Sequence, residues 1–407
     1  MHVLVLTERF HPEISAPSVR IVDHARSWIA KGHQVTVVTS APNAPRGEVF
    51  DGYQNRLFSR EDVDGITVIR LWSYMAPNQG FVRRVADWLS LAVMTVLAAP
   101  WLPKCDVILA TSPPIFTPVA GVALSWIKWT PWLMEVRDLW PASIRAVGAS
   151  NNRFLLWSLE RMELWLYARA QKIVVVTEAF RRDLSERGVP SEKIDIVRNA
   201  ADLGVFDPEA VTEDGRALLG LPRDRFIAGY VGTTGMAHGL DNLLDAASLL
   251  KAHSKVLILI LGEGAEREGL EARAKARGLD NVVFRDFMPH THMPAILTAL
   301  DASIVHLRPD PLWETVIPSK IFEGMAMGVP LIHCVRGESA SIVGDAGAGR
   351  CVPPGEPEAL AAAILELYQD PELGAQLATA GRAAAVETHN RASTGAALMV
   401  SLQSTLS

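Results

Sequence analysis

A lysine and a glutamate lie three residues apart in the segment 316–330, which reads VIPSKIFEGMAMGVP. Pro318 favours the start of a helix, so Lys320 and Glu323 are expected on one face of its first turn. The free N–H groups and positive dipole of a helix start, with an ammonium group beside them, suit a diphosphate. The Glu323 carboxylate can accept hydrogen bonds from ribose or sugar hydroxyls. The alternative is a well-capped helix in an ordinary α/β unit.

A second candidate phosphate site is the segment 230–240, YVGTTGMAHGL, in which a strand leads through a glycine-rich turn to a helix start. Gly232 and Gly235 would let the backbone approach a diphosphate closely, and the amides of the turn supply donors. The turn contains no fixed cation, and Thr234 and His238 stand where one would be expected beside a diphosphate. A tight turn that needs glycines only for its shape is the alternative.

Further charge and further donors come from other segments. Because the turn lacks a cation, neutralising a diphosphate would fall on Lys320, with Arg308 as a further candidate. In the segment 337–340, GESA, the backbone amides of a helix start at Glu338 could face the same diphosphate, with the Ser339 hydroxyl as a further donor. An exposed capping box explains that segment equally well.

In the first half of the chain, a strand ends in the segment 135–141, EVRDLWP. Asp138 could orient or deprotonate a hydroxyl of a second substrate, here called the acceptor, if its carboxylate lies within about 3 Å of that oxygen. Arg137 could contact the acceptor, or could instead form a structural ion pair with Asp138. Glu178 ends another strand and is a second polar candidate for acceptor contacts.

The first strand–helix loop and the helix start after it contain four more candidates for acceptor contacts. His11 and Glu13 lie in this loop, Ser18 lies near the helix start, where amides could touch a phosphate, and Arg20 is a candidate for an anionic acceptor group. Residues 8–18 contain no glycine, which argues against the glycine fingerprint of a nicotinamide dehydrogenase after the first strand.

Short β-branched runs alternate with helical stretches along both halves of the chain. This repetition implies parallel sheets with right-handed crossovers, and we expect two doubly wound α/β domains. A Pro/Glu/Asp-rich stretch up to about residue 224 follows the first set of strands and is the expected hinge region, and the polar residues 41–61 are expected to be an excursion loop. The expected strands are 2–7, 34–39, 66–71, 106–110, 132–136, 172–176, 194–197, 226–231, 255–261, 281–284, 302–307, 330–333 and 350–352.

Composition limits the class of protein. A chain of 407 residues with 49% hydrophobic and 21% charged residues is expected to form two globular domains. The net charge of −6 argues against nucleic acid as the main partner. Cys105, Cys334 and Cys351 lack disulfide or metal spacing, which fits a reducing cytoplasm, and the first residues form a strand rather than a signal peptide. His290 and His292 lack partners for a metal site, so no bound metal is predicted.

The tryptophans are unevenly distributed, since ten of the eleven precede residue 170. The apolar run 81–102 has about the length of a spanning helix, but Asp87 and Pro100 shorten it, so we do not expect a transmembrane segment. Aromatic and basic residues at a membrane interface keep an apolar body in lipid and a polar tip in the headgroups. We therefore expect interfacial membrane contact, with buried helices of an α/β domain as the alternative. The residues concerned are Arg83, Arg84, Trp126, Lys128, Trp129, Trp132, Trp157, Arg161, Trp165 and Arg169.

The segment 318–323, PSKIFE, resembles the donor-site signature of the family 4 glycosyltransferases, which have the GT-B fold. The resemblance covers nearly the whole chain and is carried by the order and spacing of several short segments. The DLWP and PSKIFE segments resemble those of a branch that builds bacterial surface polysaccharides and O-antigens. The other segments are 7–13, 31–39, 138–141, 176–178, 196–202 and 262–264.

The resemblance implies two Rossmann-like domains facing each other across a cleft. Residues 1–197 would form the acceptor-binding and membrane-facing domain, residues 198–388 the nucleotide-sugar domain, and residues 389–407 a helix crossing back to the first domain. The implied reaction is a retaining transfer from a nucleotide-diphosphate sugar, with UDP favoured over GDP, to a polyprenyl-diphosphate-linked saccharide. The implied location is the cytoplasmic face of the membrane, as a peripheral protein, and no cofactor or metal is implied.

The family motifs also imply roles for single residues. Gly262, Phe287 and Met288 would lie at the ribose and base, Ser319 belongs to the donor-site signature, and Arg20 would contact the lipid pyrophosphate of the acceptor.

Two glutamates separated by seven residues are usual in this family. Glu323 matches the second, expected at the ribose, but the position of the first is Thr315, with Glu314 one residue earlier. Either Glu314 reaches the donor sugar or the first glutamate is absent, and we favour its absence.

Two other functions remain open. A sugar-nucleotide epimerase of the same fold would need carboxylates and a histidine around one sugar and no lipid-facing surface, so the tryptophan-rich first half argues against it. A catalytically inactive membrane-associated scaffold would explain the missing first glutamate and the missing cation in the 230–240 turn.

Overall fold

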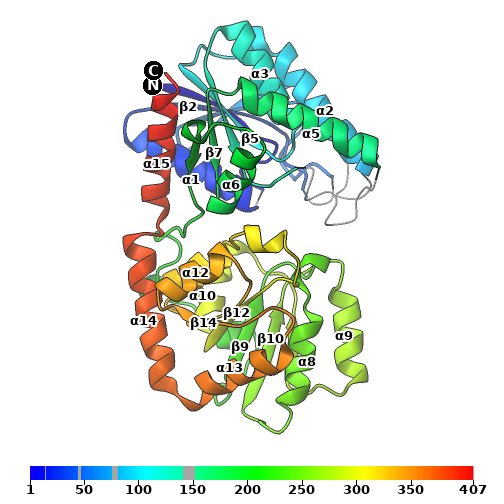
Figure 1. Ribbon diagram of the computed structural model, residues 1–407, viewed down its shortest axis with the longest axis vertical. Coiled ribbons are helices and arrows are strands. Elements are labelled where there is room, and N and C mark those ends of the chain that lie inside the picture. The colour runs from blue at the N-terminus through cyan, green and yellow to red at the C-terminus, as the bar shows by residue number, and fades with distance from the viewer. Residues whose placement is uncertain (14, 45–46, 76–80, 141–151, 407) are drawn as a thin grey trace. The chain divides into compact units, whose positions relative to one another are not determined.

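The computed structural model describes all residues except 14, 45–46, 76–80, 141–151 and 407, and it divides the chain into two compact units (Figure 1). The first unit comprises Met1–Arg198 and Arg391–Ser407, and the second comprises Asn199–Asn390. Each unit has its own sheet and its own hydrophobic clusters. The two units are therefore described separately.

The sheet of the first unit has eight strands in the order β3-β4-β2-β1-β5-β6-β7-β8. Every pairing is parallel except that of β3 with β4. The direction of strand succession reverses between β1 and β5, and open α/β sheets bind ligands at the carboxyl ends of strands next to such a switch point. The strands are β1 (His2–Leu6), β2 (Gln34–Ser40), β3 (Phe58–Val63), β4 (Ile66–Leu71), β5 (Val107–Ser112), β6 (Trp132–Val136), β7 (Lys172–Val175) and β8 (Ile194–Ile196).

Helices cover both faces of this sheet, which is why its strands read as continuous apolar runs. Along β1, Val3 packs in the buried cluster that includes residues of α1 and α15, whereas Leu4 packs in the cluster with α2, α3 and α5. Trp28 Nε1 donates to the Gly395 carbonyl at 2.9 Å, so the last helix is fixed beside α1. The helices are α1 (Ala16–Ala30), α2 (Phe81–Leu97), α3 (Phe116–Lys128), α5 (Arg153–Arg169), α6 (Glu178–Glu186) and α15 (Arg391–Ser404).

The sheet of the second unit has six strands, all parallel, in the order β11-β10-β9-β12-β13-β14. Its switch point lies between β9 and β12. The strands are β9 (Phe226–Val231), β10 (Val256–Leu261), β11 (Val282–Arg285), β12 (Ala302–His306), β13 (Leu331–Cys334) and β14 (Gly349–Cys351). The α-helices are α7 (Gly215–Leu218), α8 (Asp241–Leu249), α9 (Arg267–Ala276), α10 (Met293–Thr298), α11 (Lys320–Ala326), α12 (Glu338–Asp345), α13 (Pro357–Gln369) and α14 (Pro371–Glu387).

Each strand expected from the sequence is present, with its ends within two residues of the prediction. The structure also contains one strand that was not predicted: the edge strand β3 begins inside the predicted excursion loop 41–61. This strand is joined to β4 by Asp64 and Gly65, which have φ angles of 54° and 82°. An Asp-Gly pair of this kind is a hairpin signal, but the polar sequence of β3 hides the strand.

No helix in the described ranges is long and apolar enough to cross a bilayer. The apolar run 81–102 forms α2 and a short 3-10 helix, η1 (Ala99–Trp101), and α2 packs against α3. Four tryptophans, Trp28, Trp88, Trp132 and Trp140, are buried in the core of the first unit.

Candidate active site

Lys320 lies against the glycine-rich turn that follows β9. A Cβ atom built on Gly232, whose φ is +140°, would be 2.1 Å from Lys320 Nζ. The same Nζ atom lies 4.1 Å from the centroid of the Tyr230 ring. Only glycine at position 232 leaves room for the ammonium group, so the two segments predicted to hold a diphosphate are in direct contact.

The turn after β9 also packs against the turn after β10. A Cβ atom on Gly262 would be 2.0 Å from the Gly232 carbonyl oxygen, and one on Gly264 would be 2.5 Å from the Thr234 carbonyl oxygen. Thr234 N donates to the Glu263 carbonyl at 2.9 Å, and the Thr234 side chain is fully buried. The two turns thus form one backbone surface beside the switch point of the sheet, and the Thr234 side chain points away from solvent.

Lys320 has the properties expected of an anion-binding group. Burial lowers the pKa of its ammonium group to about 8, and the Glu323 carboxylate offsets part of that effect. Within the described residues, Lys320 Nζ donates no hydrogen bond, so it has donors available. A lysine with this pKa is still mostly charged at pH 7, and a bound diphosphate would raise its pKa.

His238 is neutral and has a fixed tautomer. Tyr230 Oη donates to the Thr233 carbonyl at 2.6 Å, so His238 Nδ1, at 2.8 Å from the same hydroxyl, must be the donor to it. Burial, with the charge of Lys320 as a smaller cause, lowers the pKa of His238 to about 4. His238 therefore adds no positive charge to the turn, and its Nε2 atom is a hydrogen-bond acceptor.

A second histidine fixes the end of the turn. His306 Nδ1 donates to the His238 carbonyl at 2.6 Å, and Asn242 Nδ2 donates to His306 Nε2 at 3.0 Å. A Cβ atom on Gly239 would be 2.9 Å from Arg308 Cβ, so the backbone of Arg308 is held against the turn. The Arg308 side chain is about one-third exposed, with Nη2 4.0 Å from Asp310.

Glu314 and Thr315 lie in the 3-10 helix η6 (Trp313–Thr315), beside the start of α12. A Cβ atom on Gly337 would be 2.0 Å from the Glu314 carbonyl oxygen. The Glu314 carboxylate lies 3.9 Å from Arg336 Nη1, and the Thr315 hydroxyl donates to the Leu312 carbonyl at 2.7 Å. The Thr315 hydroxyl thus forms a local hydrogen bond and does not take the place of the carboxylate of the first family glutamate.

The predicted contact of the Ser339 hydroxyl with a diphosphate is wrong. Its side chain is fully buried, and Oγ lies 2.8 Å from His333 Nε2. This hydroxyl bonds within the core, so it is not available to a diphosphate. Burial also lowers the pKa of His333 to about 4, which makes the pair neutral.

The other predicted donor residues lie at the carboxyl ends of the strands of the second unit. Phe287 is exposed and Met288 packs partly buried on the core, both following β11. Ser319 immediately precedes α11 without a side-chain capping bond, and Glu338 is the first residue of α12.

Asp138 follows β6 in the first unit and has the properties of a proton acceptor. Burial raises the pKa of its carboxyl group to about 6, and Arg137 offsets part of the shift. Within the described residues, its carboxylate forms no hydrogen bond and no ion pair. A base with a pKa near neutrality is well matched to proton transfer at cellular pH.

Arg137 does not form the structural ion pair that was its alternative role. Nε and Nη1 of Arg137 are buried and have no partner within the described residues. Burial lowers the pKa of the guanidinium, and the charges of Glu135 and Asp138 act in the opposite direction. A buried cation with unused donors is a candidate for an anionic ligand.

The predicted role of Arg20 is wrong. Its side chain is buried, and Nε donates to Glu135 Oε1 at 2.9 Å. Nη2 donates to the Val197 carbonyl at 2.9 Å and Nη1 to the Arg198 carbonyl at 3.0 Å. Arg20 therefore ties α1 to β6 and to the end of β8, and cannot reach a phosphate of an acceptor.

Glu13 and Ser18 are also structural rather than acceptor-facing. Glu13 is buried, and its Oε1 accepts hydrogen bonds from the backbone N–H groups of Asn43 and Ala44, at 3.0 and 2.9 Å. Ser18 is buried, and its N–H donates to Ser15 Oγ, which caps α1. These contacts fix the loops after β1 and β2, so both predicted contacts with an acceptor are wrong.

His11 and Glu178 keep accessible side chains. His11 is exposed in the loop after β1. Glu178 begins α6, and its Oε1 accepts from Arg181 Nη2 at 2.6 Å. Neither position contradicts a contact with an acceptor.

Glu8 was missed in the sequence analysis. Its Oε1 accepts a hydrogen bond from Trp88 Nε1 at 2.9 Å, and Trp88 packs edge-on against Trp140 with ring centroids 5.5 Å apart. Arg84 lies over the Trp88 ring at 4.7 Å. Glu8 follows β1, next to the switch point, and a carboxylate in that position was the signal that could have identified it.

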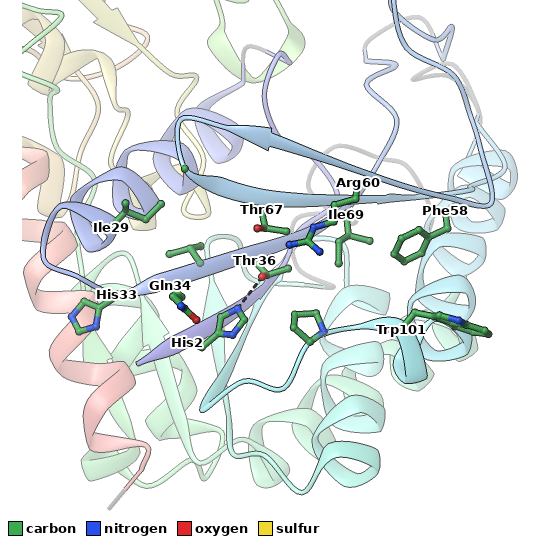
Figure 2. A pocket seen from close by; sticks show the side chains of 13 residues that line it. His2, Ile29, His33, Gln34, Thr36, Phe58, Arg60, Thr67, Ile69 and Trp101 are labelled. Atoms are coloured by element: carbon green, nitrogen blue, oxygen red, sulfur yellow. Dashed lines mark hydrogen bonds between the residues drawn. The ribbon is translucent and has the colours of Figure 1, made fainter.

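A separate cavity of the first unit lies elsewhere, at the amino ends of the strands (Figure 2). Its volume is about 780 Å³, and its lining includes His2, Thr36 and Thr67, with Trp101 on the wall contributed by η1. His2 Nε2 and Thr36 Oγ1 are 2.9 Å apart and bond to each other. None of the predicted site residues lines this cavity, so we do not assign it to the chemistry at the carboxyl edge.

No group of three or more histidine, cysteine, aspartate or glutamate side chains in the described part of the chain could hold a metal ion. His292 Nδ1 lies 2.8 Å from Glu213, and His290 packs edge-on against Phe206.

Two family models match the chain, one for each half. The family described as "Glycosyl transferase 4-like domain" matches residues 15–200. The family described as "Glycosyl transferases group 1" matches residues 211–384.

Relatives and solved structures agree with these matches along the whole chain. The colanic acid biosynthesis glycosyl transferase WcaI of Escherichia coli K12 is 24% identical over 379 residues, which cover 89% of this chain and 91% of that protein. The structure of sucrose-phosphate synthase from Thermosynechococcus elongatus has a TM-score of 0.77 at 19% identity, covering 100% of this chain and 98% of that one. Anabaena Alr3699/HepE in complex with UDP-glucose has a TM-score of 0.72 at 19% identity, covering 99% and 100%. The chain belongs to the family 4 glycosyltransferases and has the GT-B fold.

Proposed function

We propose that this glycosyltransferase moves a sugar from a UDP-sugar, with retention of configuration, to a lipid-linked saccharide during synthesis of a bacterial surface polysaccharide. The contact between Lys320 and the Gly232 turn is the observation that carries the proposal. The WcaI relative is named for colanic acid biosynthesis, and the HepE structure contains UDP-glucose, which supports a polysaccharide product and a UDP donor.

The donor half of the reaction is assigned to the second unit. Lys320 and the amides of the Gly232 turn would bind the diphosphate and stabilise the negative charge that develops on the leaving UDP. Glu323 would accept hydrogen bonds from the ribose, and the backbone near Phe287 would contact the base. Arg308 would supply a second, more exposed cation.

Reliance on Lys320 is unusually high in this proposal. His238 is neutral at pH 7, and Arg308 shares its charge with Asp310, so Lys320 is the principal fixed cation at the turn. A charged hydrogen bond is worth about 1.5–3 kcal/mol, so its removal should weaken UDP binding by roughly 10- to 150-fold.

The acceptor half is assigned to the first unit. Asp138, with a pKa of about 6, would orient the acceptor hydroxyl and accept hydrogen bonding from it as the proton moves toward the leaving phosphate. Arg137 replaces Arg20 as the residue proposed to contact the phosphates of a lipid-linked acceptor, because Nε and Nη1 of Arg137 are unused within the described residues, whereas Nε, Nη1 and Nη2 of Arg20 all donate hydrogen bonds. The reaction is proposed to need no metal, and the protein to act as a peripheral protein at the inner face of the membrane.

The test is UDP affinity measured by calorimetry, with Lys320→Ala compared with Lys275→Ala. Lys275 lies exposed on α9 and controls for the loss of one positive charge in the same unit. We expect Lys320→Ala to lose UDP binding and Lys275→Ala to keep it, with both proteins folded by thermal unfolding. Equal UDP affinity in both variants would refute the assignment of Lys320, and tighter binding of GDP than UDP would refute the choice of base.

A sugar-nucleotide panel then tests the reaction class. We expect one UDP-sugar to release UDP in the presence of membranes carrying lipid-linked saccharides. Release of no nucleotide from any donor would favour an inactive scaffold, and interconversion of two donor sugars would favour an epimerase.

A further inference from the structure

Large exposed apolar side chains in the first unit gather on three helices and their ends. α2, α3 and α5 lie side by side on one face of the sheet (Figure 1). Isolated exposed apolar residues are normal, but a contiguous set marks an interaction surface. We name this set the aromatic surface. Its members, each between 38% and 93% exposed, are Leu89, Val93, Leu97, Trp101, Trp126, Ile127, Trp129, Phe154, Trp157 and Trp165.

Direct contacts join the α3, α5 and η1 parts of the aromatic surface. Trp126 of α3 and Trp165 of α5 pack edge to face with centroids 6.1 Å apart, and the Arg169 guanidinium lies 5.8 Å from each of these rings. Lys128 Nζ donates to the Leu102 carbonyl at 2.9 Å, which ties the end of α3 to the end of η1. The surface is therefore held in shape before any partner binds.

No packing contact within the described part of the fold explains the presence of a tryptophan at position 129. It is 93% exposed, and it follows α3 in the left-handed conformation with φ of 53°. Glycine or asparagine is the favoured residue there, and a bulky side chain is strained in this conformation. A tryptophan at this position costs stability and buries no area within the unit, so its use lies outside the unit.

The helices that carry the aromatic surface are basic, although the whole chain has a net charge of −6. Arg161 lies 5.7 Å over the Trp157 ring, and the one acidic side chain of α5 that is buried, Glu163, is paired with Arg187. Tryptophan bodies bordered by arginine and lysine are suited to the boundary between acyl chains and anionic headgroups. The basic residues of α2, α3 and α5 are Arg83, Arg84, Lys128, Arg153, Arg161 and Arg169, against the acidic residues Asp87, Glu160 and Glu163.

We propose that the aromatic surface docks onto a lipid bilayer that contains anionic lipids. The proposal rests on the proposed function only in its choice of a lipid-borne acceptor, since the surface itself is carried by the exposures and contacts above. No described helix can span a bilayer, so the contact is interfacial.

This surface leads to the edge of the sheet that holds Asp138. Trp88, inside the first half of α2, bonds to Glu8 at the end of β1 and packs on Trp140, two residues after Asp138. Leu89, the next residue of α2, belongs to the aromatic surface. A bilayer lying along α2 would therefore bring a lipid-linked acceptor beside the carboxyl edge of the first unit.

Vesicle sedimentation tests the proposal, with phosphatidylcholine vesicles compared with vesicles that also contain phosphatidylglycerol. We expect binding to the anionic vesicles that weakens at high salt, because the headgroup attraction is screened. The double variant Trp126→Ser, Trp129→Asn should lose about tenfold or more in partitioning. The control Val400→Asn removes a side chain that is 64% exposed on α15, on the opposite face of the sheet, and should bind like the wild type.

A stability measurement separates loss of binding from loss of fold. Trp129→Asn alone should keep or raise the thermal unfolding midpoint while it weakens vesicle binding, since asparagine tolerates the left-handed conformation. Equal sedimentation of wild type and double variant would overturn the proposal. The proposal would also be overturned if light scattering showed a dimer for the wild type and a monomer for the double variant, because the partner of the surface would then be a second copy of the chain. We expect these variants to bind UDP as the wild type does, so failure of the docking proposal and failure of the proposed function can be told apart.

Discussion

Replacing Gly232 with alanine should disable the donor site through Lys320. The new Cβ atom would lie 2.1 Å from Lys320 Nζ and 2.4 Å from Cε, distances that no packed atoms tolerate. The φ of +140° adds backbone strain of about 1–3 kcal/mol for a residue other than glycine. Because the backbone on both sides is fixed by the turn after β10, we expect the lysine side chain to move rather than the turn.

The loss of UDP affinity in Gly232→Ala should match that in Lys320→Ala. A displaced ammonium group forfeits the same charged hydrogen bond, about 1.5–3 kcal/mol or roughly 10- to 150-fold in affinity. In the double variant the clash is gone, so the second substitution should add little. Calorimetric titration with UDP of the wild type, both single variants and the double variant measures this coupling.

Gly278→Ala is the matched control in the same unit. Gly278 also has a positive φ, +58°, but a Cβ atom there would meet nothing within 4 Å. It should therefore destabilise the fold by about 1 kcal/mol without changing UDP affinity. Additive losses in the double variant, or wild-type UDP binding by Gly232→Ala, would refute the reasoning.

Three further predictions concern charge. UDP affinity should fall as pH rises through about 8, because the deprotonated Lys320 has no charge, and calorimetry between pH 7 and 9 would detect it, whereas a flat profile would contradict the assignment. The rate of sugar transfer should rise with pH toward a plateau above about 6 as Asp138 ionises. Asp138→Asn should abolish transfer and leave UDP affinity unchanged, so a loss of UDP affinity in this variant would contradict the role of Asp138 at the acceptor. Arg137→Ala should raise the KM for a lipid-linked acceptor and leave the thermal unfolding midpoint unchanged. Arg20→Ala should lower that midpoint, because it leaves Glu135 as an unpaired buried charge. A raised KM in Arg20→Ala and a lowered midpoint in Arg137→Ala would instead identify Arg20 as the acceptor contact.

The strands of both sheets could be predicted because they are buried on both faces. Runs such as VLILIL at β10 have no other structure that fits their length and β-branched content. β3 escaped prediction because an edge strand faces solvent, so its sequence FSREDV carries no apolar run. Its only local signal was the Asp64-Gly65 turn that leads into β4.

The candidate site divides along a similar line. Gly232 and Gly262 could be predicted because a close neighbour demands glycine at each position: the Lys320 ammonium group at Gly232 and the Gly232 carbonyl at Gly262. The roles of Arg20 and Glu13 were wrong because a sequence shows a charge without its burial. Glu135, the ion-pair partner of Arg20, is 115 residues away in the sequence. Two other hydrogen bonds of Arg20 go to backbone carbonyls, which any residue has, so the sequence does not reveal them.

The single lysine explains why the turn can do without a cation of its own. Lys320 and His238 lie close enough that the charge of Lys320 helps to keep His238 neutral, and burial lowers the pKa of both. An arginine in the turn would oppose the protonation of Lys320 in the same way, since like charges in a buried site disfavour each other. The neutral His238, held by Tyr230, instead leaves one strong ammonium group and an acceptor nitrogen at the turn. That arrangement suits a diphosphate whose remaining charge is met by backbone amides rather than by a second buried cation.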